Sequence, residues 1–200
     1  LAKDISNTPH KFVQLFNRAD KILVLASEFK DQFISWGITK PVSLTSTKVD
    51  DELVFRSNPL KKEYGQTILF LARVEKVKGV FIALKAFKEI KKIKTESNLI
   101  IAGSGSALES AKKYVIDHNL QDVTFTGYIR GEELTQVFKS SDLYLFPTMH
   151  GEGMPTSVLE AMAFGLPVIS RPVGGMVDFF ENGKMGYLIE SIEPDEYATE

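Results

Sequence analysis

The chain is predicted to form a doubly wound, Rossmann-like α/β fold, and three features of its sequence indicate this. From residue 67 onward, short apolar runs alternate regularly with segments that have a helical period. The runs are almost continuously apolar, as in Thr67–Ala72, which is typical of parallel strands buried on both faces. Glycines, prolines and short polar turns separate the segments. Such alternation requires right-handed crossovers, so we expect a six-stranded parallel sheet with helices on both faces.

The elements follow in order along the second part of the chain. We expect strands at residues 67–72, 98–102, 123–126, 143–146, 167–170 and 187–189. We expect helices between them at residues 79–94, 107–118, 132–139, 156–164 and 175–181, and the start of another helix at 194–200. In the first helix, the apolar positions Val80, Ala83, Leu84, Phe87 and Ile90 recur with the period of one buried face. Two halves of three strands each make the sheet doubly wound.

The first 66 residues fit this pattern less well. Lys21–Ala26 is predicted to be a strand, and residues 27–36 a helix with Ser27 as its cap and Gly37 at its end. Residues 42–45 have the composition of another strand. Residues 46–66 contain Pro59 and Gly65 and show little periodicity, so we predict a linker or connecting loop.

Composition excludes several classes of function. The 200 residues are 44% hydrophobic and 25% charged with a formal net charge of −2, so nothing indicates nucleic acid as a partner. The absence of cysteine excludes disulfides, thiolate metal sites and a cysteine nucleophile. The three histidines lack metal-ligand spacing. No apolar run reaches the roughly 18 residues that span a bilayer.

The cationic run Lys85–Lys94 is best interpreted as a solvated helix face, with contact to a membrane surface left open. Because the first residue is Leu1, we expect the chain to begin within a longer protein.

Open parallel sheets bind ligands beyond the carboxyl ends of the strands, where the winding reverses. The loops after the first and fourth strands of the sheet are therefore the candidates. After the first strand, Arg73 stands at the strand end and Lys78 at the start of the next helix. A guanidinium and an ammonium so placed can point at one phosphate group. For a single lysine, the alternative of an ordinary surface position is the stronger one.

The loop after the fourth strand, residues 147–156, contains glycines, and two glutamates lie in it or shortly after it. Glycines allow close approach of the backbone, and Pro155 suits the first turn of a helix whose free N–H groups attract anions. Glu152 lies in the loop, and Glu160 lies on the helix that follows. A carboxylate accepts hydrogen bonds from two vicinal sugar hydroxyls. Since the helix around Glu160 is apolar on nearly all sides, we expect it to be buried and Glu160 to need a partner.

Two weaker signals complete the list. Gly103-Ser-Gly105 follows the second strand, and alone it is little evidence for a dinucleotide site. Leu108 stands where that motif has its third glycine, and the next strand ends in Thr126 instead of an acid, so NAD or FAD binding remains the weaker alternative. His150 is interpreted mainly as an exposed loop residue, with a place at the rim of a sugar or acceptor site left open.

Together these segments resemble a known family. Glu152-Gly-Met-Pro-Thr-Ser-Val-Leu-Glu160 is similar to the signature of family 4 of the retaining, nucleotide-sugar-dependent glycosyltransferases (group 1 type), in which two glutamates are separated by seven residues. Further segments resemble the family in the same order: Arg73–Gly79, Ile101–Gly105, Val123–Tyr128, Asp142–Pro147, Ala163–Val168, Gly174-Gly175 and Gly183–Leu188. The joint pattern is specific although each piece is not.

The resemblance covers residues 18–190 and implies a protein of two Rossmann-like domains that face a cleft. It implies that residues 1–41 are a remnant of an N-terminal acceptor domain, 42–66 the linker, and 67–200 the C-terminal nucleotide-sugar-binding domain, cut off in its last helix. Ser46-Thr47 departs from the family's Pro-Asn-Gly at the domain entry. The family's acceptor-side histidine would lie before Leu1, and His10 is not a convincing substitute.

The resemblance also implies roles for residues. Arg73 and Lys78 would neutralise the leaving diphosphate, Glu160 would hold the ribose, and Glu152 would bind hydroxyls of the donor sugar. Other residues implied to bind the donor are Gly153, Met154, Pro155, Thr156 and Ser157 at the helix start, Gly103 and Gly105 in the glycine-rich turn, and Gly127, Tyr128 and Ile129 beside the base. Because the chain has no Asp-x-Asp motif, we expect no metal and no other cofactor.

The implied reaction is retaining transfer of a sugar from a nucleoside diphosphate to a glycan, lipid or other acceptor, for example in polysaccharide biosynthesis. The implied partner within the same protein is the missing N-terminal domain, without which this chain would bind nucleotide but transfer no sugar. The expected location is the cytoplasm, with peripheral association at the inner face of a membrane left open. A non-catalytic sensor of nucleotide sugars on the same domain stays as a further alternative.

Overall fold

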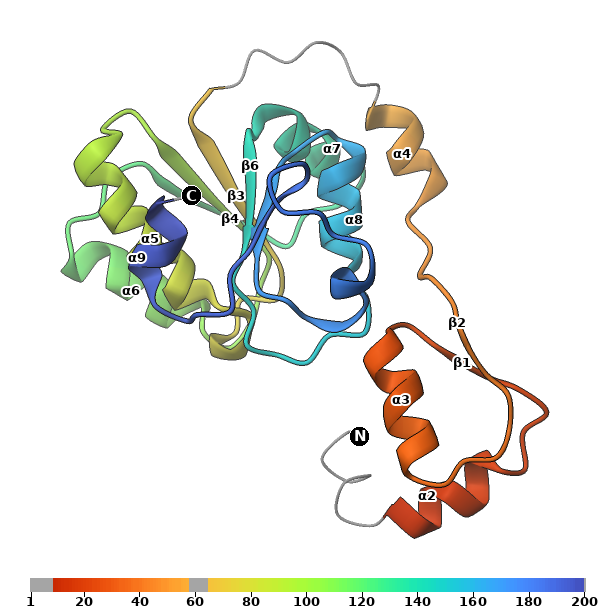
Figure 1. The fold of residues 1–200 in the computed structure, drawn as a ribbon. Coiled ribbons are helices and arrows are strands. Elements are labelled where there is room, and N and C mark those ends of the chain that lie inside the picture. The colour runs from red at the N-terminus through yellow and green to blue at the C-terminus, as the bar shows by residue number, and fades with distance from the viewer. Residues whose placement is uncertain (1–8, 58–64, 200) are drawn as a thin grey trace. The chain divides into compact units, whose positions relative to one another are not determined.

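The computed structural model describes residues 9–57 and 65–199, which form two compact units (Figure 1). Unit 1 contains the described residues up to Thr47 together with Glu152–Met154 and Val173–Phe179. Unit 2 contains the described residues of Lys48–Gly151, Pro155–Pro172 and from Phe180 onward. Each unit has its own core, and each is described by itself below.

Unit 2 is built on a six-stranded sheet in which all strands are parallel. The strand order is β5-β4-β3-β6-β7-β8, so the winding reverses between β3 and β6, and the prediction of a doubly wound sheet is confirmed. The strands are β3 (Thr67–Leu71), β4 (Asn98–Ala102), β5 (Val123–Gly127), β6 (Leu143–Phe146), β7 (Val168–Ser170) and β8 (Gly186–Leu188).

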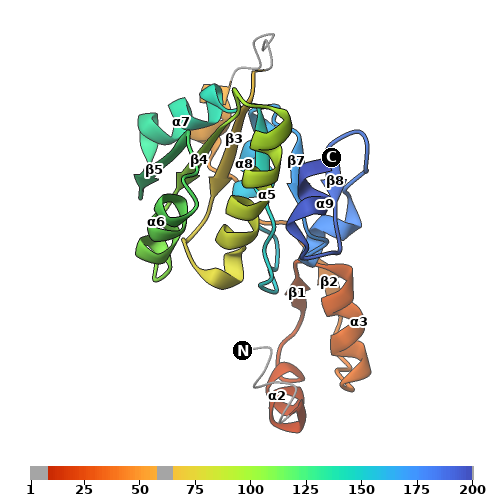
Figure 2. The same cartoon turned by 90° about the vertical axis from the view of Figure 1, so that its left-hand side faces the viewer.

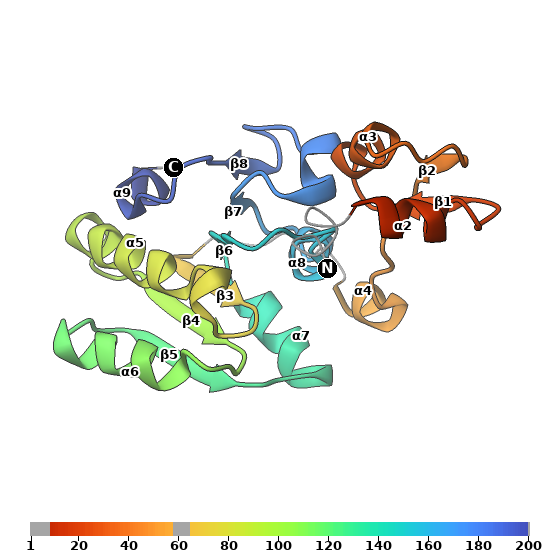
Figure 3. The same cartoon turned by 90° about the horizontal axis from the view of Figure 1, so that it is seen from below.

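Helices cover both faces of this sheet, as Figures 2 and 3 show. One face carries α5 (Val80–Ile93), α6 (Leu108–Asp117) and α9 (Pro194–Thr199), with α9 packed along α5. The other face carries α7 (Gly131–Ser140) and α8 (Thr156–Ala163), and α4 (Asp51–Ser57) packs on both. This distribution follows from right-handed crossovers that run in opposite directions from the two central strands.

The core of unit 2 lies between the central strands and α5. Leu69, Phe70 and Phe87 are fully buried, which explains why the sequence of β3 is apolar without alternation. Burying a side chain such as Phe87 contributes about 1.5–3 kcal/mol. The loops that follow β3, β4, β5 and β6, together with α8, carry the candidate site residues.

Unit 1 contains a small parallel pair of strands with two helices. Strands β1 (Ile22–Val24) and β2 (Val42–Leu44) pair in register, and they are accompanied by α2 (Pro9–Phe16) and α3 (Ser27–Ser35). Its buried cluster contains Ile22 and Val24, and the rings of Phe16 and Phe33 pack with centroids 4.8 Å apart.

Three details differ from the prediction. Residues 175–181 do not form an α-helix: Gly174–Asp178 form a single 3-10 turn, η2, because two consecutive glycines disfavour a longer helix. The predicted linker 46–66 contains α4, a short amphipathic helix that buries Leu53 and Ser57; Pro59 lies outside the described residues. Finally, Ser27 is the first helical residue of α3, and the cap position is Ala26.

Candidate functional site

The loops that follow β3 and β6 meet where the winding of the sheet reverses. The main-chain N–H of Met149 donates to the carbonyl of Val77 over 2.8 Å. Gly79 follows the 3-10 turn η1 (Lys76–Lys78) with φ +86°, and a Cβ added there would lie 2.1 Å from the carbonyl oxygen of Pro147. No side chain fits that contact, so glycine is required to bring the two loops together.

Two cations stand in the loop after β3. Arg73 follows the strand end with its side chain 64% exposed, and its Nη1 pairs with Glu75 Oε1 over 2.7 Å. Lys78 is only 8% exposed, and lysine is seldom buried to this extent. A buried lysine and an exposed arginine in one short loop can neutralise a diphosphate. Glu75 was not among the predicted site residues, because only the structure shows that its carboxylate pairs with Arg73. In this position it competes with a phosphate group for the guanidinium.

The glycine-rich turn after β4 lies against the loop after β3. The N–H of Val74 donates to the carbonyl of Ser104 over 2.9 Å, and the Gly103 N–H donates to Gly127 at the end of β5 over 2.7 Å. Gly105 lies so close to Val74 that a Cβ there would meet its carbonyl oxygen at 2.4 Å. The structure therefore brings together the loops after β5, β4, β3 and β6 in one row.

The end of β5 presents one aromatic side chain to solvent. Tyr128 is 75% exposed, whereas the neighbouring Ile129 is buried and anchors the segment. An exposed aromatic ring suits a nucleobase, which can stack on it.

The first turn of α8 is anchored by a tyrosine from the sheet. Pro155 occupies the cap position and Thr156 is the first helical residue. The hydroxyl of Tyr144 lies 2.7 Å from Ser157 Oγ and 2.8 Å from the carbonyl oxygen of Leu71. Tyr144 is fully buried, so it fixes the start of α8 to the end of β3. Sequence reasoning missed this residue, since a tyrosine inside an apolar strand is indistinguishable from core.

Glu160 lies in the second turn of α8 and is half-buried. The expectation that α8 is buried all round was wrong: Val158 and Ala161 are buried, and the rest of the face around Glu160 is partly exposed. Burial is the main cause that raises the pKa of the Glu160 carboxyl above its ordinary value, and the negative charge of Asp50 raises it further. Asp50 precedes α4, and its Oδ1 accepts from the N–H of Glu52 over 2.9 Å.

Glu152, Gly153 and Met154 belong to unit 1, unlike the other predicted site residues. The carbonyl of Gly153 accepts from the N–H of Gly175 over 2.7 Å. His150 is exposed, and its main-chain N–H donates to Thr148 Oγ1 over 3.1 Å. The first glutamate of the signature therefore lies in a segment that the η2 turn contacts, and the second lies on α8 of unit 2.

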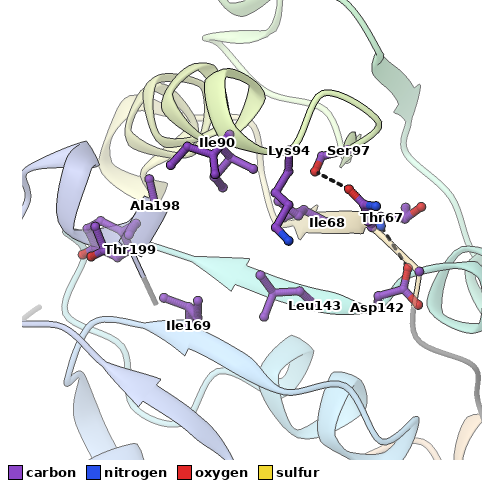
Figure 4. A pocket seen from close by; sticks show the side chains of 14 residues that line it. Thr67, Ile68, Ile90, Lys94, Ser97, Asp142, Leu143, Ile169, Ala198 and Thr199 are labelled. Carbon is purple, nitrogen blue, oxygen red and sulfur yellow. Dashed lines mark hydrogen bonds between the residues drawn. The ribbon is translucent and has the colours of Figure 1, made fainter.

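A separate cavity of about 690 Å³ lies in unit 2 at the amino ends of the strands, between α5 and α9 (Figure 4). Its walls are mostly apolar and include Ile68, Ile90 and Leu143, and the Asp142 carboxylate at one end accepts from the N–H of Thr67 over 2.9 Å. Ala198 also lines it, at the end of α9. None of the predicted donor-binding residues lines this cavity.

Within residues 9–57 and 65–199, no three acidic or histidine side chains gather closely enough to hold a metal ion. In the same part of the chain, no helix combines the length and the apolar character needed to cross a bilayer.

Comparisons with known proteins point in one direction. The model of the glycosyl transferases group 1 family matches residues 51–200. An uncharacterised glycosyltransferase of Methanocaldococcus jannaschii is 25% identical over 189 residues, which cover 91% of this chain and 48% of that protein. The amylovoran biosynthesis glycosyltransferase AmsK of Erwinia amylovora is 26% identical over 190 residues, covering 88% of this chain and 45% of AmsK.

Among solved structures, Anabaena HepE in complex with UDP and glucose superposes with a TM-score of 0.77 at 20% identity. The superposition covers 94% of this chain and 54% of HepE, and at this identity it speaks for the fold alone. The chain spans about half the length of the curated relatives that it matches.

Proposed function

Since this chain belongs to the glycosyl transferases group 1 family, we propose that it is the donor-binding part of a retaining glycosyltransferase. Its donor would be a nucleoside diphosphate sugar, and because HepE was solved with UDP, uracil is the first base to test. The observation that carries the proposal is the loop Arg73–Gly79, in which a buried lysine and an exposed arginine lie where the winding reverses. The family match leaves the NAD or FAD alternative without support.

Each part of the donor meets a different loop in this proposal. Arg73 and Lys78 bind the diphosphate together with the free N–H groups at the start of α8. Glu160 accepts hydrogen bonds from the ribose hydroxyls. Main chain at residues 127–129 receives the base, with Tyr128 beside it. Glu152 accepts from hydroxyls of the donor sugar.

The reaction proposed is attack on the face of the sugar that the diphosphate leaves. The bond from the sugar C1 to the diphosphate oxygen breaks, the bond from the acceptor oxygen to C1 forms, and the acceptor proton passes to the leaving phosphate. Arg73 and Lys78 stabilise the charge that grows on the diphosphate. A double displacement with Glu152 as nucleophile is the less favoured alternative. No metal is needed for this chemistry, because the two cations carry the countercharge.

The chain alone is proposed to bind donor without transferring sugar. Transfer needs groups from two walls, held against the reacting carbon with water excluded. These 200 residues supply the donor wall, and the relatives are about twice as long as the region they share with this chain. The acceptor, whether glycan or lipid, would meet the other half of the protein in the cytoplasm or at a membrane surface.

Calorimetric titration with UDP, GDP, ADP and TDP tests this proposal. We expect one diphosphate to bind clearly better than the others. Replacing Arg73 or Lys78 by alanine should weaken that binding roughly 10- to 150-fold, since each charge-assisted contact is worth about 1.5–3 kcal/mol. Lys113, an exposed lysine of α6 that pairs with Asp117, is the matched control and should change nothing when replaced. Absence of binding to every diphosphate, or an equal loss in the control, would contradict the proposal.

A further inference from the structure

Helix α3 lacks a cap from its own sequence. Its cap residue is Ala26, whose side chain cannot accept a hydrogen bond, and no side-chain cap bond is formed there. The first N–H groups of a helix need an acceptor, and a negative charge is favoured at that end. Asp178, 151 residues away in the sequence, meets this need. Its Oδ2 accepts from the N–H of Ser27 over 2.8 Å, and its Oδ1 accepts from the Ser27 hydroxyl.

Asp178 is the last residue of η2, and the first residues of η2 hold the segment of Glu152. Gly174 has φ +52°, and a Cβ there would lie 2.2 Å from the carbonyl oxygens of both Glu152 and Gly153. The N–H of Gly175 donates to the carbonyl of Gly153 over 2.7 Å. The turn therefore touches the Glu152 segment along its main chain at one end and α3 at the other.

Leu25, the residue before the cap of α3, also contacts η2 and the Glu152 segment. A Cβ on Gly175 would lie 2.2 Å from the carbonyl oxygen of Leu25, and one on Gly153 would lie 2.8 Å from Leu25 Cδ1. The segments around Leu25, Glu152 and Gly175 thus form a closed contact within unit 1. The bonds from Ser27 to Asp178 fasten it.

We propose that Asp178 is a positioning residue for Glu152: by capping α3 it fixes η2, and η2 fixes the main chain that carries Glu152. This inference rests on the proposed role of Glu152 at the donor sugar. In this proposal Asp178 acts through η2 and not by contact with the donor. When the bond from Asp178 to Ser27 is lost, the Glu152 segment moves more freely. The chain then binds the nucleotide sugar more weakly, while its affinity for the nucleoside diphosphate alone is unchanged.

The variants are Asp178→Asn, which keeps the shape but loses charge and an acceptor, and Ser27→Ala, which removes one of the two bonds. Glu28→Gln is the matched control, because Glu28 is an exposed acid in the same first turn of α3. Amide hydrogen exchange at Gly175 is the readout that needs no ligand. We expect it to be roughly five-fold faster in Asp178→Asn, less affected in Ser27→Ala, and unchanged in Glu28→Gln.

The second readout is the affinity for UDP-glucose compared with that for UDP. In Asp178→Asn we expect UDP-glucose to bind about three-fold or more weakly while UDP binding stays the same, because only the sugar reaches Glu152. The double variant with Ser27→Ala should lose no more than Asp178→Asn alone. Unchanged exchange at Gly175, or an equal loss for UDP and UDP-glucose, overturns the inference. Failure of the proposed function looks different, because the unmodified chain would then bind neither compound.

Discussion

Replacing Gly79 by alanine tests whether the loops after β3 and β6 must touch for this fold to form its site. Gly79 has φ +86° and Gly183 has φ +82°, and both lie in unit 2. Nothing lies within 4 Å of a Cβ built on Gly183, whereas one on Gly79 would be 2.1 Å from the Pro147 carbonyl oxygen. The two glycines therefore share a backbone conformation and differ in the space around it.

The expected loss of folding stability in each variant has up to two contributions. An L-residue in the left-handed region costs about 1–2 kcal/mol, and this cost applies to both variants. In Gly79→Ala the two loops must also separate by roughly 1 Å, and overpacking of that kind costs about 1–3 kcal/mol more. Since 1 kcal/mol lowers the Tm of a domain of this size by about 2–4 °C, Gly79→Ala should melt roughly 2–12 °C below Gly183→Ala.

Differential scanning calorimetry of the two variants measures this difference. Gly79→Ala should also bind nucleoside diphosphate more weakly, because separating the loops moves Lys78, while Gly183→Ala should bind as the unmodified chain does. Equal melting temperatures for the two variants would show that the contact with Pro147 does not constrain the fold, and the reasoning would be refuted.

The remaining predictions concern titration, metal and the loop histidine. Because the pKa of Glu160 is raised in the folded chain, its protonated form stabilises the fold fully below the ordinary pKa of 4.5, and this stabilisation is lost as pH rises through the raised pKa. Over the same pH range the carboxylate forms, so ribose binding should strengthen. Asp50→Asn keeps the α4 cap and should shift the rise in nucleotide affinity to lower pH; a shift of the same size in Asp51→Asn would argue against this coupling. EDTA should leave nucleotide affinity unchanged, and a large loss would reveal a missed cation site. His150→Ala should leave donor affinity unaltered, and a marked loss would place His150 at the sugar.

The parallel sheet was predictable because burial on both faces leaves continuous apolar runs such as Thr67–Leu71 between glycine and proline turns. Helix α4 was not, since seven residues that bury only Leu53 and Ser57 give too short a period to recognise. The turn η2 was mistaken for a helix because Met176 and Val177 are apolar, as the buried face of a helix would be. The two glycines before them disfavour an α-helix there.

Candidate site residues could be proposed from the sequence where their placement depends on order along the chain. Arg73 and Lys78 could be proposed from their place after a strand, because topology puts that loop at the winding reversal. The pairing of Asp178 with Ser27 spans 151 residues, and the influence of Asp50 on Glu160 acts through space. Neither leaves a periodic or local pattern in the sequence, so only the folded chain reveals them.

We propose that this chain binds the diphosphate of a nucleotide sugar at the carboxyl ends of β3 and β6. A crystal structure of the chain with the preferred nucleoside diphosphate tests it most directly. We expect phosphates within hydrogen-bonding distance of Arg73 and Lys78, the ribose at Glu160, and the base at residues 127–129. A nucleotide bound in the cavity beside Ile90, at the opposite ends of the strands, would contradict it.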